Sequence, residues 1–148
     1  MYRNILIATD GSDLAHKAVV HGLGLAKSVG AKVTAVVVEA PFDAMHVPES
    51  RARHMSEEFE SHAKAIKRHA DKVLGNVADA ARQAGLACDT VQVEHEQPYQ
   101  AIINTAEEKG CDAIVMASHG RSGITALLLG SVTNKVLTHT AIPVLVIH

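Results

Sequence analysis

The sequence predicts an α/β fold in which helices cover both faces of a parallel sheet. Five short segments rich in Val, Ile and Ala alternate with four segments whose apolar residues recur at a helical period. Glycines stand at the ends of three of these helical segments, where helices commonly terminate. The first apolar segment is hydrophobic at most positions, which is typical of a strand buried on both faces. Regular alternation of strands and helices favours a parallel sheet.

The first strand is expected at residues 3–9, "RNILIAT", and is followed by an Asp-Gly-Ser turn. A helical period begins at Ser12, whose hydroxyl can accept a hydrogen bond from a free backbone N–H and so cap the helix. Gly30 is the predicted end of this helix. The predicted apolar face of the helix consists of Leu14, Ala15, Ala18, Val19, Gly22, Leu25, Ala26 and Val29. Residues 31–40, rich in β-branched side chains, are the second predicted strand.

Residues 41–50 contain two prolines and no clear period, so we expect a loop there. A long helix is predicted over residues 49–84, ending at Gly85. Its apolar stripe consists of Met55, Phe59, Ala63, Ile66, Ala70, Val73, Leu74, Val77 and Ala81. The remaining elements are a strand at 86–95, a helix at 97–110 with Pro near its start, a strand at 111–118, a short helix at 130–140 and a strand at 142–148.

Length and composition are those of an ordinary globular domain, and we expect residues 1–148 to form a single one. The formal net charge of −2 and the 3% content of aromatic residues offer neither a basic surface nor stacking platforms, so nucleic acid and anionic membranes are not expected partners. The chain has no apolar run as long as a membrane span and no cleavable signal pattern at its start. We therefore expect a cytoplasmic protein in which Cys88 and Cys111 are reduced thiols.

Histidine is abundant, with ten residues in the chain. His54, His62 and His69 fall along the long predicted helix, but none has the partner four residues away that a helical zinc pair requires. We interpret them as solvated side chains that adjust the charge of the protein near neutral pH.

Three segments with polar or charged residues follow predicted strands, namely residues 10–12, 38–40 and 118–120. In open parallel sheets, ligands bind beyond the carboxyl ends of the strands, where the strand order reverses. If the first and fourth strands are neighbours, residues 10–12 and 118–120 converge at one such point.

The segment after the fourth strand has the properties of a phosphate site. Gly120 and Gly123 permit a close approach of backbone, and Arg121 supplies a positive charge nearby. Gly130 and Ser131 stand at a predicted helix start, where unpaired N–H groups, a hydroxyl and the positive end of the helix dipole favour anions. The pattern is neither the phosphate loop Gly-x4-Gly-Lys-(Ser/Thr) nor the dinucleotide turn Gly-x-Gly-x2-Gly.

Three stretches together resemble the universal stress protein family: "NILIATDGSDLAHKAV", "DAIVMASHGRSG" and "LLLGSVTNKVLTHTAIPVLVI". The resemblance covers essentially the whole chain. It implies a doubly wound, Rossmann-like fold of the adenine nucleotide alpha hydrolase type, with five parallel strands in the order 3-2-1-4-5. In that order the strands that Cys88 and Cys111 flank are not adjacent, so no disulfide is expected between them.

The nucleotide-binding branch of that family is marked by Gly-x2-Gly-x9-Gly-(Ser/Thr). Here Gly120 is the second glycine, nine residues separate it from Gly130, and Ser131 follows. The first glycine is replaced by Ala117. If that position requires a left-handed backbone, alanine costs about 1–2 kcal/mol. If the glycine only leaves space, the methyl group is tolerated or trims the pocket.

The resemblance implies roles for individual residues. Asp10 would face the ribose, or an Mg²⁺ or Mn²⁺ ion that bridges the phosphates of ATP, and the backbone near Val37 or Val38 would contact the adenine edge. The phosphates would be cradled by Ser118, His119, Gly120, Gly130, Ser131 and Val132. The alternatives are that Asp10 and Ser131 only cap helices, that His119 is an exposed loop residue and that Arg121 is a solvated charge.

The favoured function is therefore that of an ATP-binding, homodimeric regulator in the stress response. The last strand would lie at a sheet edge and pair antiparallel with a second copy, burying either Val144 and Val146 or Leu145 and Ile147. The alternative is that a helix of the same chain covers this edge. One further hypothesis is a family member that binds no nucleotide and acts through an unknown protein partner. The other is a slow ATP hydrolase, which is less favoured because no orienting partner for Asp10 or His119 is evident.

Overall fold

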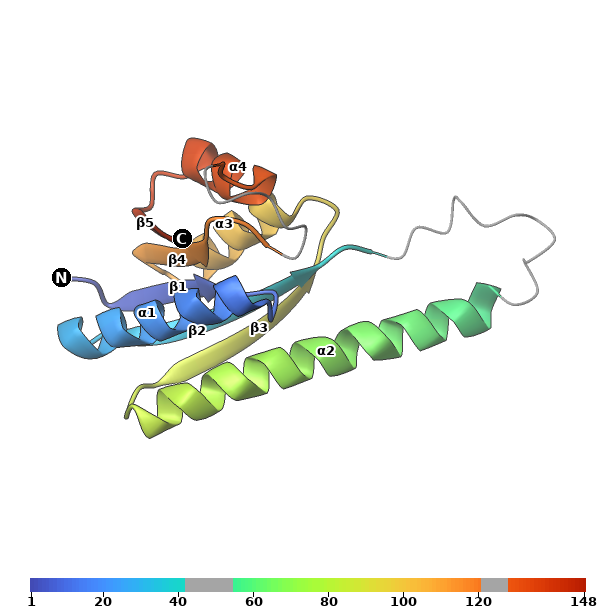
Figure 1. The fold of residues 1–148 in the computed structure, drawn as a ribbon, viewed down its shortest axis with the longest axis horizontal. Helices are drawn as coiled ribbons and strands as arrows, with labels where there is room; N and C mark the ends of the chain where they lie inside the picture. Colours follow the sequence, from blue (N-terminus) through green and yellow to red (C-terminus); the bar gives the residue numbers. More distant parts are fainter. Residues whose placement is uncertain (42–54, 121–127) are drawn as a thin grey trace.

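The computed structural model describes residues 1–41, 55–120 and 128–148. Five strands and four helices alternate in these ranges (Figure 1). In chain order they are β1 Asn4–Ala8, α1 Asp13–Val29, β2 Lys32–Glu39, α2 Met55–Gln83, β3 Cys88–Glu94, α3 Pro98–Glu108, β4 Ala113–Ala117, α4 Ser131–His139 and β5 Val144–Ile147. Every predicted strand and helix is present, and apart from the start of the long helix each bound lies within a few residues of its expected position. The predicted loop at 41–50 and residues 49–54 of the predicted long helix lie almost wholly outside the described residues.

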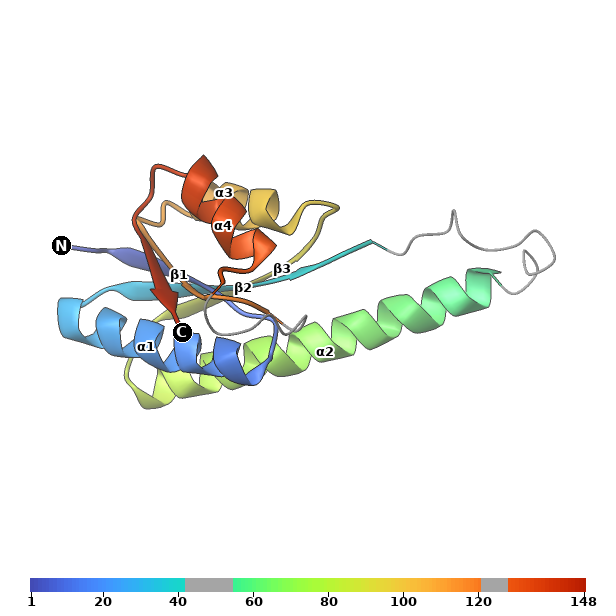
Figure 2. The ribbon, with the colours of Figure 1, turned by 45° about the horizontal axis from the view of Figure 1, so that its top comes forward.

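The strands form one parallel sheet in the order β3-β2-β1-β4-β5, which confirms the expected topology. Helices α1 and α2 cover one face and α3 and α4 cover the other (Figures 1 and 2). The chain winds from β1 through β2 to β3, then crosses to the other side of β1 to form β4 and β5. Strand order therefore reverses between β1 and β4, at the centre of the sheet.

The core is divided in two by the sheet. Ile5 and Ile7 pack with α1 and α2, whereas Leu6, between them in sequence, packs with α3 and α4. All three side chains are fully buried, as a period of two requires for a strand covered on both faces.

Helix α1 begins after its predicted N-cap residue, Ser12, and ends at the predicted glycine, Gly30. The Ser12 hydroxyl accepts a hydrogen bond from the N–H of Ala15 at 3.2 Å, and Gly30 ends the helix with a left-handed φ of 72°. The predicted apolar face is correct except at its edges. Leu23 is buried although it was not assigned to that face, and Leu14, Leu25 and Val29 are only half-buried. The buried stripe of a helix packed on a sheet is wider than a narrow seam of residues, which is why Leu23 also reaches the core.

Helix α2 extends beyond the sheet at its N-terminal end (Figures 1 and 2). Its 29 residues span about 43 Å, whereas the eight residues of β2 span about 26 Å. The predicted stripe is buried from Ala70 to Ala81, but Phe59 remains 50% exposed. The prediction of a buried stripe is therefore confirmed only for the half of the helix that lies over the sheet.

Cys88 and Cys111 are both free thiols, as expected. Burial raises the pKa of each thiol above its ordinary value. None of the helices within the described ranges is both long and apolar enough to cross a lipid bilayer.

Candidate functional site

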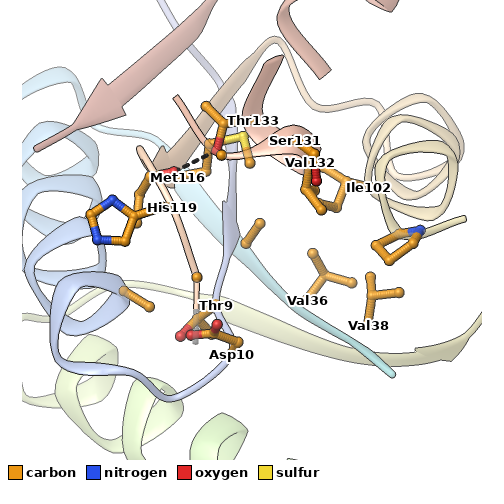
Figure 3. Close-up of a pocket in the computed structure, with 16 residues that line it drawn as sticks. Thr9, Asp10, Val36, Val38, Ile102, Met116, His119, Ser131, Val132 and Thr133 are labelled. Carbon is orange, nitrogen blue, oxygen red and sulfur yellow. Dashed lines mark hydrogen bonds between the residues drawn. The ribbon is translucent and has the colours of Figure 1, made fainter. Parts of the chain in front are cut away.

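A cavity of about 340 Å³ lies at the carboxyl ends of β1, β2 and β4, on the side of the sheet that α3 and α4 cover (Figure 3). This is the point where strand order reverses. The cavity is lined by Ala8, Thr9, Asp10, Ala15, Val36, Val38, Pro98, Ile102, Met116, Ala117, His119, Gly120, Gly130, Ser131, Val132 and Thr133. The two segments expected to converge, after the first and fourth strands, are both in its wall.

Asp10 lies in a tight turn between β1 and α1. Its carboxylate accepts a hydrogen bond from the N–H of Ser12 at 2.9 Å, and the Thr9 hydroxyl accepts one from the N–H of Gly11 at 3.2 Å. Ser12, not Asp10, caps α1, so the interpretation of Asp10 as a helix cap is wrong. The carboxylate is positioned instead by the turn and by the neighbouring segment after β4.

Gly120 is the neighbour that approaches Asp10. A Cβ atom on Gly120 would lie 2.7 Å from Oδ2 of Asp10, closer than side-chain atoms pack. A glycine at this position therefore lets the segment after β4 reach the Asp10 turn.

Ala117 is the last residue of β4 and lines the cavity. Among the described residues, every one with a positive φ is a glycine, so the left-handed alternative for this position is wrong. Its carbonyl accepts a hydrogen bond from the hydroxyl of Thr133 at 2.8 Å, drawn as a dashed line in Figure 3. Only the alternative that concerns space remains: Ala117 borders the cavity, and it packs in the core on the α1 and α2 face of the sheet.

Ser118 does not line the cavity. It is buried, its N–H donates to the carbonyl of Ile147 at 2.8 Å, and its carbonyl accepts from the N–H of Gly130 at 2.7 Å. It thus joins the end of β4 to β5 and to the start of α4. The next residue, His119, lines the cavity and is half-buried, so its interpretation as an exposed loop residue is wrong.

The start of α4 faces the cavity. Gly130 is the N-cap residue, and a Cβ atom there would lie 3.1 Å from the Cα of His119. Ser131 is the first residue of the helix rather than its cap, which corrects that interpretation. The first hydrogen bond of the helix runs from the N–H of Asn134 to the carbonyl of Gly130, so the amides of Ser131, Val132 and Thr133 have no acceptor within the helix.

The part of the cavity wall across from Asp10 and Thr9 is apolar. Val36, Val38 and Ile102 lie together there (Figure 3). Val37 is fully buried in the core on the other face of the sheet, so its side chain does not line the cavity. The strand period of two could have identified Val36 as the partner of Val38.

Several lining residues escaped the sequence analysis. Ile102 comes from α3 and Met116 from β4, and neither was singled out from the sequence. Nothing in their local pattern distinguishes the apolar wall of a cavity from a closed core. Arg121 and Gly123, predicted near the phosphates, lie outside the described residues.

Comparisons with known proteins agree on one family. The sequence profile described as "Universal stress protein family" matches residues 1–148. The universal stress protein YxiE of Bacillus subtilis is 33% identical over 156 aligned positions, covering all of both chains.

Two solved structures extend the similarity to the fold. The protein MJ0577, solved as a test case of structural genomics, superposes with a TM-score of 0.81 at 27% identity and covers 99% of this chain and 96% of its own. A universal stress protein in complex with cAMP superposes with a TM-score of 0.70 at 25% identity, covering 99% and 97% of the two chains.

Proposed function

The chain belongs to the universal stress protein family, and we propose that its cavity binds an adenine nucleotide, ATP with Mg²⁺ or Mn²⁺, in a regulatory role. One observation carries the proposal: a single cavity joins an apolar wall to the N-terminus of α4. An adenine nucleotide has the same division, an aromatic base at one end and phosphates at the other. A relative whose crystal structure holds cAMP supports the class of ligand.

The base would occupy the apolar end. Val36, Val38 and Ile102 form a wall against which the faces of an adenine ring would lose contact with water. Val38 is close to the end of β2, which leaves the backbone at this edge available to the polar edge of the base. With a volume of about 340 Å³, the cavity is at the lower end of the range for small-molecule sites, about 300–1,000 Å³.

The phosphates would occupy the end formed by α4. The amides of Ser131, Val132 and Thr133 lie at the positive end of the helix dipole, and the Ser131 hydroxyl stands beside them. His119 and Gly120 complete this end from the segment after β4. Gly130 contributes by allowing the two segments to pack in contact.

Among the residues that the structure describes, Asp10 is the one whose carboxylate lines the cavity. Beside a triphosphate it would be repulsive unless it bound a ribose hydroxyl or shared a divalent cation with the phosphates. Within the described residues, no three His, Cys, Asp or Glu side chains are grouped so that they could hold a metal ion. The phosphates would therefore supply most of the ligands of Mg²⁺ or Mn²⁺, with Asp10 as the contribution of the protein, and the cation would neutralise phosphate charge.

A regulatory role is favoured over rapid turnover. A hydrolase needs a base that is positioned to activate water. The Asp10 carboxylate accepts a hydrogen bond in its own turn, and Nδ1 of His119 lies 3.2 Å from the hydroxyl of Ser118, which belongs to the structural joint with β5. We propose that nucleotide occupancy changes how the protein contacts a partner in the cytoplasm, where free Cys88 and Cys111 remain reduced.

The same proposal includes a homodimer formed through β5. This strand is at the edge of the sheet, and Leu145 within it is 43% exposed. An exposed apolar edge strand favours pairing with another strand. A second copy of β5, related by a two-fold axis, would supply an antiparallel partner.

A negative charge introduced at residue 131 tests whether the phosphates lie at the start of α4. Ser131→Asp places a negative charge at the N-terminus of α4, where it is favourable to the free helix but repels phosphate. Ser131→Asn has nearly the same shape without the charge and is the matched control. We expect the Asp variant to bind ATP–Mg²⁺ at least tenfold more weakly than the wild type in calorimetric titrations, and the Asn variant to stay within about threefold.

One further ligand and one measurement of stability make the result specific. Adenosine, which lacks phosphates, should bind all three proteins equally, and the melting temperature of the ligand-free Asp variant should not fall. If ATP–Mg²⁺ binds the Asp and Asn variants with the same affinity, the phosphates do not lie at α4 and the proposed orientation is wrong.

A further inference from the structure

We propose that His69 of α2 is a positioning residue for the nucleotide cavity, because it holds the Asp10–Gly11 turn by a hydrogen bond to the carbonyl of Asp10. Sequence alone suggested a solvated histidine at this position. In the structure the side chain is half-buried, and its Nε2 lies 3.1 Å from the Asp10 oxygen. That the turn serves a ligand rests on the proposed function; the contact itself does not.

The chemistry of the contact fixes the role of each atom. A carbonyl oxygen only accepts hydrogen bonds, so Nε2 of His69 must carry the proton. Both the neutral ring with its proton on Nε2 and the imidazolium can donate there. The hydrogen bond is therefore available in either charge state of the ring.

Helix α2 also supports the turn by direct packing. Gly11 has a left-handed φ of 83°, and a Cβ atom on it would lie 2.7 Å from Cγ2 of Val73 and 3.3 Å from Cε1 of His69. The turn is thus pressed against two successive turns of α2. The hydrogen bonds from Gly11 to Thr9 and from Ser12 to Asp10 are local, whereas that of His69 comes from 59 residues away.

The hydrogen bond from His69 to the Asp10 carbonyl helps to position the Asp10 carboxylate. On its other side, Oδ2 of Asp10 faces Gly120 with no room for a Cβ atom between them. The turn is therefore clamped between α2 and the segment after β4. Loss of the His69 hydrogen bond would release one side of the clamp, and small displacements of a binding group are enough to weaken a ligand.

The surroundings of His69 make substitutions practical. Its ring lines a second cavity of about 220 Å³ on the α1 and α2 side of the turn, together with Thr9, Ser12 and His16. Replacing the ring therefore alters a partly open crevice rather than a close-packed core. His69→Gln keeps an N–H donor at the same number of bonds from Cα, whereas His69→Leu removes the donor. His69→Met is a second donor-free variant in case the Leu protein folds poorly.

The first measurement needs no ligand. Backbone amide chemical shifts of Gly11 and Ser12 should move in His69→Leu and His69→Met and stay close to the wild type in His69→Gln. If they are unchanged in both donor-free variants, the hydrogen bond does not position the turn and the inference is wrong.

The second measurement is a double-mutant cycle on ATP–Mg²⁺ affinity. His69→Leu should weaken binding about tenfold and His69→Gln less than about threefold. In an Asp10→Ala background His69→Leu should cause no further loss, because His69 acts through that turn.

The outcomes separate the two claims. An equal loss of ATP affinity from His69→Leu in both backgrounds would show that the residue does not act through Asp10, which overturns the inference. A wild-type protein that binds no nucleotide would contradict the proposed function, whereas the amide shifts would still decide whether His69 positions the turn.

Discussion

Gly120 and Gly130 provide room for neighbouring chain segments rather than unusual backbone angles. A Cβ atom on Gly120 would meet the Asp10 carboxylate, and one on Gly130 would meet the backbone of His119. Neither has the positive φ that marks Gly11 and three other described glycines. The glycine motif is therefore explained by close packing around the cavity. Alanine at position 117, in extended backbone at the edge of the cavity and in the same core cluster as Ile5 and Ile7, is compatible with this arrangement.

This account predicts a small effect of Ala117→Gly on the ligand and a larger one on stability. A glycine in a strand loses more conformational entropy on folding, and a buried methyl group is lost, so the free energy of unfolding should fall by about 1–2 kcal/mol. Affinity for ATP–Mg²⁺ should change by less than about threefold. Urea unfolding and calorimetric titration would measure the two effects. A tenfold gain in affinity would show instead that the methyl group occupies space that the ligand needs.

Asp112 joins the start of β1 to the turn before β4. The N–H groups of Arg3 and Asn4 donate to its carboxylate at 3.0–3.2 Å. Burial acts to raise the pKa of this carboxyl, but the backbone N–H groups of Arg3, Asn4 and Asp112 itself, together with the charge of Arg3, hold its pKa below the ordinary value. A lowered folded-state pKa gives stabilisation that is present above the unfolded pKa and is lost as pH falls through the folded pKa.

Asp112→Asn should therefore be less stable than the wild type at pH 7 and pH 5. The difference in unfolding free energy should shrink as pH falls below about 4, where the wild-type carboxyl becomes protonated in the unfolded chain and then in the folded chain. Urea unfolding at pH 7, 5 and 3 would measure it. A difference that is the same at all three pH values would exclude the charge of Asp112 as its cause.

At the scale of elements, β5 presents one free side of its backbone. The carbonyls of Pro143 and Ile147 accept hydrogen bonds from the N–H groups of Ile114 in β4 and of Ser118 just after it. Because backbone groups alternate sides along a strand, the N–H and C=O groups of Val144 and Val146 point away from β4. These are the groups that a second copy of β5 would pair with in the proposed dimer.

Val146→Pro is expected to convert the dimer to a monomer. It removes an N–H on the outer side of the strand and leaves the bonds to β4 in place, a position where proline is tolerated. Val146→Thr keeps both the N–H and the branched shape and should remain dimeric. Sedimentation velocity would give the masses of the three proteins, and their melting temperatures would confirm that each is folded. A Pro variant that still sediments as a dimer would assign the interface to another surface.

At the scale of the whole molecule, local pattern predicted far more of the fold than of the cavity. The period of each segment and the caps at Ser12 and Gly30 were enough to place the elements, because apolar spacing and helix caps are local features of the chain. The strand order came from the resemblance. The apolar wall could not be predicted, since Ile102 and Met116 have the same pattern in a cavity as in a closed core. The contact of His69 with Asp10 joins residues too distant in sequence for any local pattern to reveal.

The central claim is that one cavity binds both the base and the phosphates of an adenine nucleotide, and thermal unfolding of the wild-type chain tests it most directly. A ligand that binds only the folded state stabilises it by about 2.7 kcal/mol at a concentration one hundred times its dissociation constant. For a chain of 148 residues, the melting temperature should then rise by about 5 °C or more with ATP–Mg²⁺, and by much less with adenosine or tripolyphosphate–Mg²⁺ at the same concentration. No rise at millimolar ATP–Mg²⁺, or an equal rise with tripolyphosphate–Mg²⁺, would contradict the claim.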